Sequence, residues 1–491
     1  MDGPESLDGG AATAARNIVI FSDGTGQDGG LRPEQRASNV YKLYRACRIS
    51  PENDIDPARQ VVFYDPGLGT DASATGFTAI KRTINKILAS ATGRGITVNI
   101  ADCYEFLINH YRPGDRIFLF GFSRGAYTIR SVANVLWLCG IPTRCPAGPL
   151  PRFRNGVRDI ADEAVLRVYE HGAGHRRQDY EAERLELARR FQAKYASGDS
   201  DGSNAAPYFI GAFDTVASLG AKGPVRLFLN LLILAVIVAS GLAIASLVDL
   251  FVPIDFWKAS LIGAAVVAVY VAGRRLKRML KVMRDPPGRR GGFSWHLAQW
   301  TGKNFDMKLG GNVEYARHAI AIDENRDDFA RLGWGHSQRL RPKVEGKPDQ
   351  LVQLWFAGNH SDIGGSYPEE ESRLSDITLQ WMVEEARSLP EPLVINARRL
   401  HLFPSAAGLQ HDEVAGMNDV ICRRTPTFLR WATRGLSWKR NVRDPRPDSP
   451  MHPSVDERFG MESVPHQGGS GPYRPEALRN HERYRHLYAE I

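Results

Sequence analysis

Cysteine is scarce in this chain, and the few cysteines form no recognisable pattern. There are five among 491 residues, no two of them stand in a C-x-x-C pair, and their odd number leaves one over. Small secreted domains that depend on disulfides carry many more cysteines at close spacing. A disulfide framework is therefore excluded, and free thiols in a reducing compartment are expected at Cys47, Cys103, Cys139, Cys145 and Cys422.

The N-terminal residues lack the features of a secretory signal. They are acidic and rich in small residues, and no basic segment is followed by an apolar one. A signal peptide requires that order. We therefore expect residues 1–16 to be a disordered leader.

Signals for nucleic-acid binding are also missing. The formal net charge of +8 comes from lysine and arginine spread over the chain, with local clusters at 274–281 and 423–443. No basic helix carries interleaved aromatic residues, and no nucleic-acid-binding motif is present. A lipid bilayer is the better candidate partner, and the sequence leaves the oligomeric state open.

The glycine-rich loop at residues 23–30 lacks the Gly-Lys-Ser/Thr ending of a P-loop and the spacing of a dinucleotide fingerprint. A phosphate cradle remains an alternative, but an oxyanion hole is the favoured use, with backbone N–H groups from Gly24 or Thr25 acting together with that of Arg124. Asp23 and Asp362 could hold a divalent cation, yet no ligand cluster surrounds them, so loop-fixing hydrogen bonds are favoured. No metal or organic cofactor is expected.

The chain does contain a strong local pattern at residues 116–134, RIFLFGFSRGAYTIRSVAN. An apolar run suited to a buried strand is followed by a tight turn with Ser123 at its apex and then by a segment with helical periodicity. A strained turn of this kind needs glycine where a side chain would strike the neighbouring strand or helix, and Gly121 and Gly125 hold those places. The pattern predicts a nucleophile elbow; an ordinary strand-to-helix turn is the alternative.

Further apolar runs, at 17–22, 60–64, 208–213 and 351–356, alternate with helical segments. This alternation predicts an α/β fold, α/β-hydrolase-like, with a mostly parallel sheet and helices on both faces. Asp214 and His360 each follow one of these runs, where parallel strands deliver residues to a ligand crevice. Their order after Ser123 matches the nucleophile, acid, histidine order of that fold. His318 is a rival base, rated lower because residues 315–324 read as a helix.

The longest hydrophobic run, Leu227 to Val248, has 22 residues without a charge, enough for a membrane helix. An acidic turn at 249–255 and a weaker run at 256–272 follow it. Both basic flanks lie on the same side of this hairpin, so the positive-inside rule predicts two spans of the inner membrane with the catalytic parts in the cytoplasm. A hydrophobic lid or a buried helical hairpin is the alternative.

These features divide the chain into four parts. We expect a leader at 1–16, an α/β-hydrolase domain at 17–225 and 285–410 with a helical excursion at 150–205, a membrane hairpin with its basic flank at 226–284, and a C-terminal extension at 411–491. No chemistry can be assigned to the extension.

Several sequence blocks resemble a family of largely uncharacterised α/β-hydrolase domains that includes the catalytic domain of type VI secretion phospholipase effectors. The blocks are FSDGT (21–25), YDPGLGT (64–70), GFSRGAYTIR (121–130), FDTVASLG (213–220), HAIAIDENR (318–326), WFAGNHSDIGGSY (355–367) and LSDITLQWM (374–382). The chain departs from the family at Gly26, where an aromatic residue is frequent, and in the hydrophobic hairpin.

The resemblance implies a membrane-associated serine hydrolase of lipid esters, in particular phospholipids, with Ser123 as nucleophile, Asp214 as acid and His360 as base. Two alternatives remain. The fold could serve as a catalytically silent, membrane-tethered binding or regulatory protein, or it could act as a thioesterase or amidase on a soluble substrate.

Overall fold

The computed structural model describes residues 15–24, 36–67, 94–199, 202–216, 223–249, 255–299, 308–335, 340–416 and 439–488. Most of the predicted leader, residue Thr25 and most of the 423–443 basic cluster lie outside these ranges.

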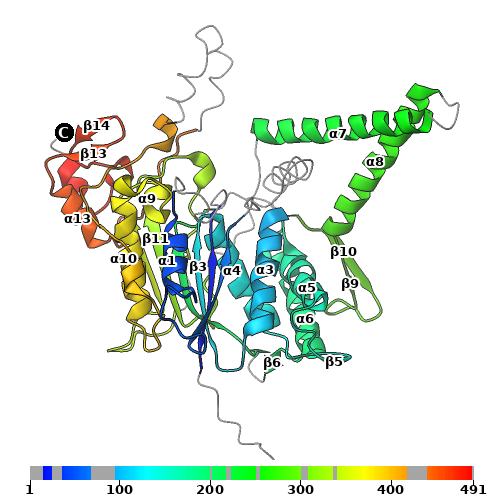
Figure 1. Cartoon of the computed structure of the whole chain (residues 1–491), viewed down its shortest axis with the longest axis horizontal. Helices are drawn as coiled ribbons and strands as arrows, with labels where there is room; N and C mark the ends of the chain where they lie inside the picture. Colours follow the sequence, from blue (N-terminus) through cyan, green and yellow to red (C-terminus); the bar gives the residue numbers. More distant parts are fainter. Residues whose placement is uncertain are drawn as a thin grey trace, which may run out of the picture.

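A six-stranded parallel sheet forms the centre of the molecule, as the sequence predicts (Figure 1). Its spatial order is β12-β11-β8-β3-β1-β2. The strands are β1 (Asn17–Ser22), β2 (Gln60–Asp65), β3 (Arg116–Phe122), β8 (Pro207–Phe213), β11 (Tyr315–Ala321) and β12 (Leu351–Phe356). Because all pairs are parallel, the carboxyl ends of these strands lie along one edge.

Helices cover both faces of the sheet, and the alternation of side chains along each strand decides which helices they meet. From β1, Ile18 and Ile20 join the core formed with α3 (Arg94–His110) and α4 (Arg124–Cys139). Val19 and Phe21 point to the other face and pack with α1 (Asn39–Cys47) and α10 (Arg373–Arg387). The fold class is therefore α/β.

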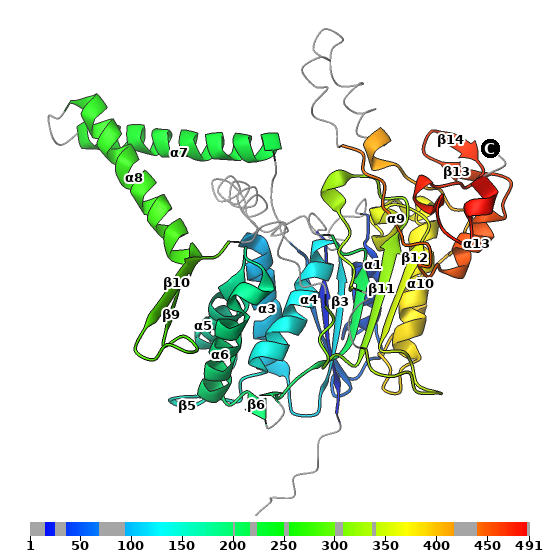
Figure 2. The ribbon, with the colours of Figure 1, turned by 180° about the vertical axis from the view of Figure 1, so that it is seen from behind.

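The predicted excursion at 150–205 adds an outer helical layer against α3 and α4 (Figure 2). It contains α5 (Asn155–Asp162), the π-helical η1 (Glu163–Val168), η2 (Tyr169–Gly172) and α6 (Arg177–Tyr195). Short strand pairs flank it, β4 (Arg144–Cys145) with β5 (Gly148–Pro149) and β6 (Gly198–Asp199) with β7 (Gly202–Ser203).

The helix predicted at residues 315–324 is wrong, because Tyr315–Ala321 forms β11 between β8 and β12. All seven residues of this strand are buried. A central parallel strand covered on both faces shows no alternation of polar and apolar residues, so its pattern cannot be told from that of a buried helix.

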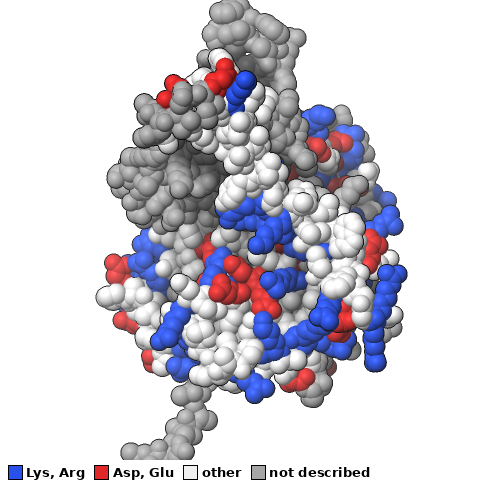
Figure 3. Space-filling view, turned by 90° about the vertical axis from the view of Figure 1, so that its right-hand side faces the viewer, with Lys and Arg blue, Asp and Glu red and all other residues white. Residues whose placement is uncertain are grey.

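Two long apolar helices project from the body, α7 (Gly223–Asp249) and α8 (Phe256–Met279) (Figures 1 and 2). They contact each other through small residues: a Cβ added to Gly241 would lie 2.6 Å from the Ser260 carbonyl oxygen. Close approach through small residues is typical of membrane helix pairs. Figure 3 shows the pair from its outer side as a largely uncharged surface, with a group of basic residues where it joins the body.

The strand β9 (Leu280–Arg284) follows α8 directly and forms an antiparallel hairpin with β10 (Phe293–Leu297). Part of the basic run predicted to flank the second apolar segment is thus the end of α8, and Lys281 is a buried residue of β9.

The C-terminal extension packs on the edge strand β12. The Trp355 backbone N–H donates to the Pro450 carbonyl at 3.1 Å, and its carbonyl accepts from His452 N–H at 2.9 Å, so the extension covers an edge that would otherwise be open. The extension includes α13 (Pro453–Phe459), β13 (Val464–His466), β14 (Gly469–Gly471), η7 (Glu476–Leu478) and η8 (Arg485–Tyr488). The remaining elements are η3 (Asp327–Phe329), α9 (His360–Gly364), η4 (Glu369–Glu371) and η5 (Ala397–Arg399).

The structure describes four of the five cysteines, Cys47, Cys103, Cys139 and Cys145, and all four are free thiols.

Candidate active site

Ser123 lies between the last residue of β3 and the first residue of α4, with φ 58° and ψ −120°. This backbone conformation is strained for a residue with a side chain. A Cβ on Gly121 would lie 2.5 Å from the Gly125 carbonyl oxygen, and a Cβ on Gly125 would lie 1.9 Å from the Ser22 carbonyl oxygen. Only glycine fits at either position, which is the geometry that a nucleophile elbow requires.

Asp214 and His360 form a hydrogen-bonded pair at the carboxyl edge of the sheet. Asp214 follows β8, and His360 is the first residue of α9, just beyond β12. The His360 Nδ1 atom lies 2.5 Å from Asp214 Oδ2, and both side chains are buried. The Asp214 backbone N–H donates to Ala319 O at 2.8 Å, and Asp214 Oδ1 accepts from the Ala321 N–H at 3.0 Å, which fixes the carboxylate.

The elbow is tied to the same edge. The Ser123 N–H donates to the carbonyl of Phe213, the residue before Asp214, at 3.1 Å. Since His360 uses Nδ1 to contact Asp214, its Nε2 atom is the nitrogen left for another partner. The structure thus brings the loops of Ser123, Asp214 and His360 to one end of the sheet, after β3, β8 and β12.

Arg443 is a buried member of the site that the sequence does not reveal. Its Nη1 and Nη2 atoms donate to Asp214 Oδ1 and Oδ2 at 2.5 and 2.9 Å. Burial alone would raise the pKa of Asp214, but the Arg443 charge, followed by the hydrogen bond from His360, holds that pKa well below its usual range. Arg443 lies 229 residues away in the C-terminal extension, and no local motif marks it.

Aromatic and charged side chains surround His360. The rings of Phe122 and Phe329 lie 4.6 and 5.1 Å from the imidazole, between centroids. The His360 backbone N–H donates to Glu324 Oε2 at 3.2 Å, and Arg326 pairs with the same carboxylate at 2.6 Å. These contacts restrict both the ring and the start of α9.

The predicted oxyanion loop lies beside the elbow. A Cβ added to Gly24 would be 3.4 Å from Ser123 Cβ, so this backbone is adjacent to the serine. However, the Gly24 N–H donates to Asp23 Oδ1 at 2.7 Å and is already engaged. Thr25 lies outside the described residues, and Arg124 N–H stands at the start of α4, where backbone amides are unpaired within a helix.

Asp23 and Asp362 both accept several hydrogen bonds that hold loops. Asp23 Oδ2 accepts from the hydroxyls of Ser38 and Tyr64, and burial raises the pKa of Asp23 to about 6. Asp362 accepts from the backbone N–H groups of Asn359 and His411 at 3.0 and 3.1 Å, and from His411 Nδ1 at 2.8 Å.

The rival base His318 is a residue of β11 and is fully buried. Burial lowers its pKa to about 3, and its Nε2 atom accepts from the Thr215 N–H at 3.3 Å. His318 therefore stabilises the turn after Asp214 through the backbone of Thr215.

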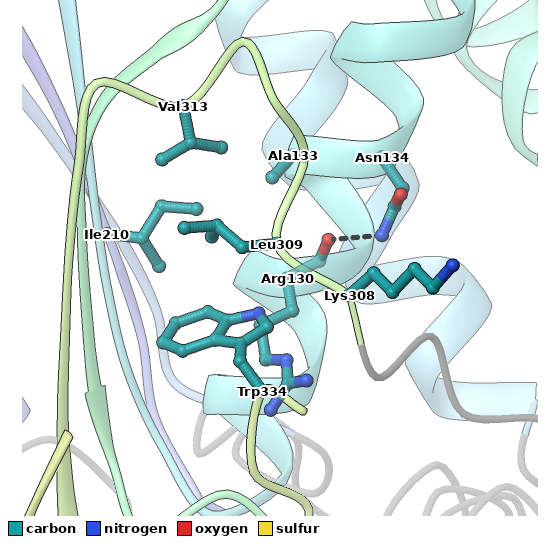
Figure 4. Close-up of a pocket in the computed structure, with 9 residues that line it drawn as sticks. Arg130, Ala133, Asn134, Ile210, Lys308, Leu309, Val313 and Trp334 are labelled. Atoms are coloured by element: carbon teal, nitrogen blue, oxygen red, sulfur yellow. Dashed lines mark hydrogen bonds between the residues drawn. The ribbon is translucent and has the colours of Figure 1, made fainter. Parts of the chain in front are cut away.

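A separate small pocket lies between α4 and the segment before β11 (Figure 4). Arg130, Lys308, Leu309 and Trp334 are among its lining residues, and Ser123, Asp214 and His360 are not. The Arg130 guanidinium lies 4.6 Å from the Trp334 ring centroid and donates to the Leu332 carbonyl. The pocket is therefore distinct from the candidate active site.

The fold and the site define an α/β-hydrolase-like protein with a serine elbow and a histidine–aspartate pair. The chain belongs to the family described as "T6SS, Phospholipase effector Tle1-like, catalytic domain", whose family model matches residues 16–241 and 278–385. The unmatched segment between these ranges contains the end of α7 and nearly all of α8.

Known proteins are similar to this chain over much of its length. An uncharacterized protein of Saccharomyces cerevisiae is 25% identical over 427 residues, which cover 76% of this chain and 57% of the yeast protein. The chain thus spans little more than half of this relative.

Two solved structures are more distant. An uncharacterized protein from Pseudomonas aeruginosa shares 16% identity with a TM-score of 0.32, over 79% of this chain and 48% of the other. The Tle1 effector bound to the VgrG spike from the type VI secretion system shares 17% identity with a TM-score of 0.24, over 74% and 54%.

Proposed function

We propose that this protein is a membrane-associated serine hydrolase that cleaves carboxylic esters of lipids, in particular phospholipids. The observation that carries the proposal is the His360–Asp214 hydrogen bond of 2.5 Å at the sheet edge where Ser123 occupies its strained elbow. Membership of the phospholipase effector family supports the lipid substrate.

In the proposed mechanism, the Ser123 hydroxyl attacks the ester carbonyl while His360 Nε2 takes its proton. Asp214 orients the imidazole through Nδ1 and stabilises its charged form. The Arg124 N–H and a donor from the 24–25 loop hold the oxyanion, and His360 then protonates the leaving alcohol. Water activated by His360 releases the acyl group from Ser123.

Membrane association is proposed from the surface of α7 and α8. The most apolar 18-residue stretches of Leu231–Asp249 and Phe256–Met279 have mean hydropathies of 2.8 and 1.6, and only 11% and 17% of the residues in these stretches are buried. A helix that serves as the core of a soluble protein buries its apolar side chains, whereas these leave most of theirs exposed. Arg274, Arg275, Lys277 and Arg278 near the end of α8 would lie on the cytoplasmic side of an inner membrane, together with the catalytic part.

The hairpin β9–β10 extends this apolar surface. One of its faces exposes Trp295 by 71%, Phe293 by 65% and Val282 by 57%, and the strand β9 is continuous with α8. Tryptophan is favoured at the boundary between hydrocarbon and headgroups, and phenylalanine inserts its apolar ring on the acyl side of that boundary. We propose that this face contacts the bilayer interface and holds the carboxyl edge of the sheet near its substrate.

The decisive test compares purified wild type with Ser123→Ala, in detergent, on a panel of phospholipids, short acyl esters, soluble thioesters and soluble amides. Loss of turnover in the variant, with membrane association retained, is the expected result. Undiminished hydrolysis by Ser123→Ala would refute the serine mechanism. If the panel shows hydrolysis only of soluble thioesters or amides, the lipid substrate is wrong although the mechanism stands.

A catalytically silent membrane-tethered protein is the second candidate, and two observations favour considering it. Arg443 shares both carboxylate oxygens of Asp214, and the Gly24 N–H is occupied by Asp23. A fluorophosphonate probe distinguishes the candidates because it labels only an activated serine. Labelling at Ser123 supports the hydrolase, and folded protein that stays unlabelled supports the silent form.

A further inference from the structure

A cluster of two histidines and one glutamate lies where the outer helical layer meets the β9–β10 hairpin. None of the three residues belongs to the candidate active site. His171 belongs to η2, Glu183 to α6 and His296 to β10. One potential ligand atom from each side chain lies within 4.8 Å of the others. His171 Nε2 and Glu183 Oε2 are 2.7 Å apart.

His296 carries an unpartnered nitrogen. Its Nε2 atom lies 2.6 Å from the carbonyl oxygen of His171, so Nε2 holds the proton and donates it. The Nδ1 atom therefore keeps a free lone pair, and it is buried without a hydrogen-bond partner among the described residues. The whole residue is only 7% exposed. Leaving such an acceptor unpaired costs about 1–3 kcal/mol, which a bound ion would offset.

The remaining contacts orient the donors in the way that metal sites do. The second oxygen of Glu183 accepts from the Ser294 hydroxyl at 2.8 Å, and the Tyr180 ring stacks on His296 at 3.8 Å between centroids. Hydrogen bonds to the non-ligating atoms of a metal ligand fix its tautomer and direction.

The nearest cation in the cluster is Lys281, opposite His296 in the hairpin. Its Nζ atom donates to the Leu166 carbonyl at 2.7 Å, so a backbone oxygen fixes the position of the ammonium group.

We propose that His171, Glu183 and His296 bind a divalent transition-metal ion, best matched by Zn²⁺. Two imidazole nitrogens and one carboxylate oxygen are ligands that Zn²⁺ accepts at about 2.0–2.2 Å, with a fourth position left for water. Binding replaces the direct His171–Glu183 hydrogen bond. The two ligand atoms, now 2.7 Å apart, move to the separation of about 3.3 Å that tetrahedral geometry implies.

The ion joins two elements that are neighbours in sequence, η2 and α6, to a distant third, β10. It ties η2 and α6 to β10, directly below the end of α8 (Figures 1 and 2). Its role is therefore to brace the helical layer against the base of the α7–α8 pair. This inference does not depend on the proposed hydrolase function.

The test uses the full chain in detergent, dialysed against a chelator and titrated with Zn²⁺ and with Co²⁺ as a spectroscopic probe. One equivalent of either metal is expected to bind, with a rise in Tm and, for Co²⁺, the intense visible absorption of a four- or five-coordinate site. Wild type that gains neither a Tm shift nor this absorption overturns the proposal.

Variants locate the ion. Glu183→Gln keeps groups able to hydrogen-bond His171 and Ser294 but removes the anionic ligand, and His296→Gln removes the free nitrogen. Each should weaken Zn²⁺ binding at least about a hundredfold. His175→Gln is the matched control, because His175 lies 5.6 Å from His296 between ring centroids but uses its Nε2 on the Leu297 carbonyl. Binding that survives in both ligand variants, or that His175→Gln abolishes equally, also overturns it.

Discussion

Asp214 receives an unusually complete set of partners. His360, Arg443 and two backbone amide interactions with β11 converge on this residue from three parts of the chain. A buried carboxylate requires such compensation, because removing one charged partner leaves the other charge unpaired in a region of low polarisability. The arginine also contacts the carbonyls of Ala321 and Phe329, so it positions the acid and the loops on either side.

Replacing Arg443 tests this positioning role. Arg443→Met should lower the free energy of unfolding by about 3–5 kcal/mol, because Asp214 loses its arginine. Arg443→Lys keeps the charge but not the two-pronged geometry, so stability should fall less while kcat falls with KM nearly unchanged. Thermal unfolding and steady-state kinetics measure the two effects. If both variants match wild type, Arg443 has no positioning role.

His411 makes a pH-dependent contact with Asp362, two residues after His360 in α9. Burial opposes its charged form, but the hydrogen bond and charge of Asp362, with Glu371, raise the pKa of His411 overall. The folded state thus binds this proton more tightly than the unfolded state, and the stabilisation is complete below the unfolded pKa of about 6.5 and is lost as pH rises through the folded value.

The His411→Asn variant should therefore lose more stability at pH 6 than at pH 9. Thermal unfolding across this range measures the difference, with the exposed His401→Asn as control. A loss of Tm that is equal at both pH values would show that the ion pair contributes nothing.

At the scale of elements, the β9–β10 hairpin has two different faces. One face buries Lys281, Met283 and His296 against the helical layer, and the other exposes large apolar side chains. A two-stranded hairpin is marginal by itself, so both faces need a partner. The inner face has the helical layer, and the outer face has none within the described residues.

The double substitution Phe293→Ser and Trp295→Ser should weaken binding to phospholipid vesicles without unfolding the protein, since both side chains are exposed. Losing about 300 Å² of apolar contact corresponds to several kcal/mol of partitioning. Vesicle flotation is measured in a chain that lacks residues 226–279, so that α7 and α8 do not contribute to binding. Phe153→Ser in the same shortened chain is the control, because Phe153 is exposed by 70% at a site away from the hairpin. Equal flotation of the shortened chain, its double variant and its Phe153→Ser variant would refute the interfacial contact.

For the whole molecule, the central question is whether α7 and α8 lie in lipid. Leu234 and Val238 are one turn apart on α7 and are exposed by 55% and 48%. A lysine at the centre of a membrane helix costs about 2.5–3.5 kcal/mol. Replacing both residues with lysine should therefore release the protein from the membrane fraction after alkaline extraction.

The control for this experiment is Leu185→Lys on α6, which is exposed by 41% on the helical layer. This change should leave the membrane fraction unaltered. If the α7 double variant also stays in the membrane fraction, the pair does not span the bilayer.

The division into domains remains a proposal, with the hydrolase part at 17–225 and 285–410 and an extension at 411–491. The extension nevertheless contributes more than a cover for β12, because Arg443 reaches the carboxylate that pairs with His360. We therefore regard the extension as part of the proposed catalytic unit.

Local features of the chain were predictable from the sequence because their causes are local. The strands at 17–22 and 351–356 are confirmed residue for residue, and the elbow geometry depends on two glycines within five residues. Asp214 and His360 were predicted from their places after strands, since a parallel sheet brings its carboxyl ends to one edge. Their catalytic roles stay a prediction.

Other features depend on packing between distant segments. The strand β11 reads as a helix until it pairs with β8 and β12 and the layers on both sides of the sheet bury its two faces. Arg443 meets Asp214, and His171 and Glu183 meet His296, only after the chain has folded. By itself the sequence determined the other five strands of the sheet, the elbow and the apolar hairpin, because short-range sterics and hydrophobic periodicity set them. The tertiary structure alone decided which buried charges pair, because that depends on which surfaces come together.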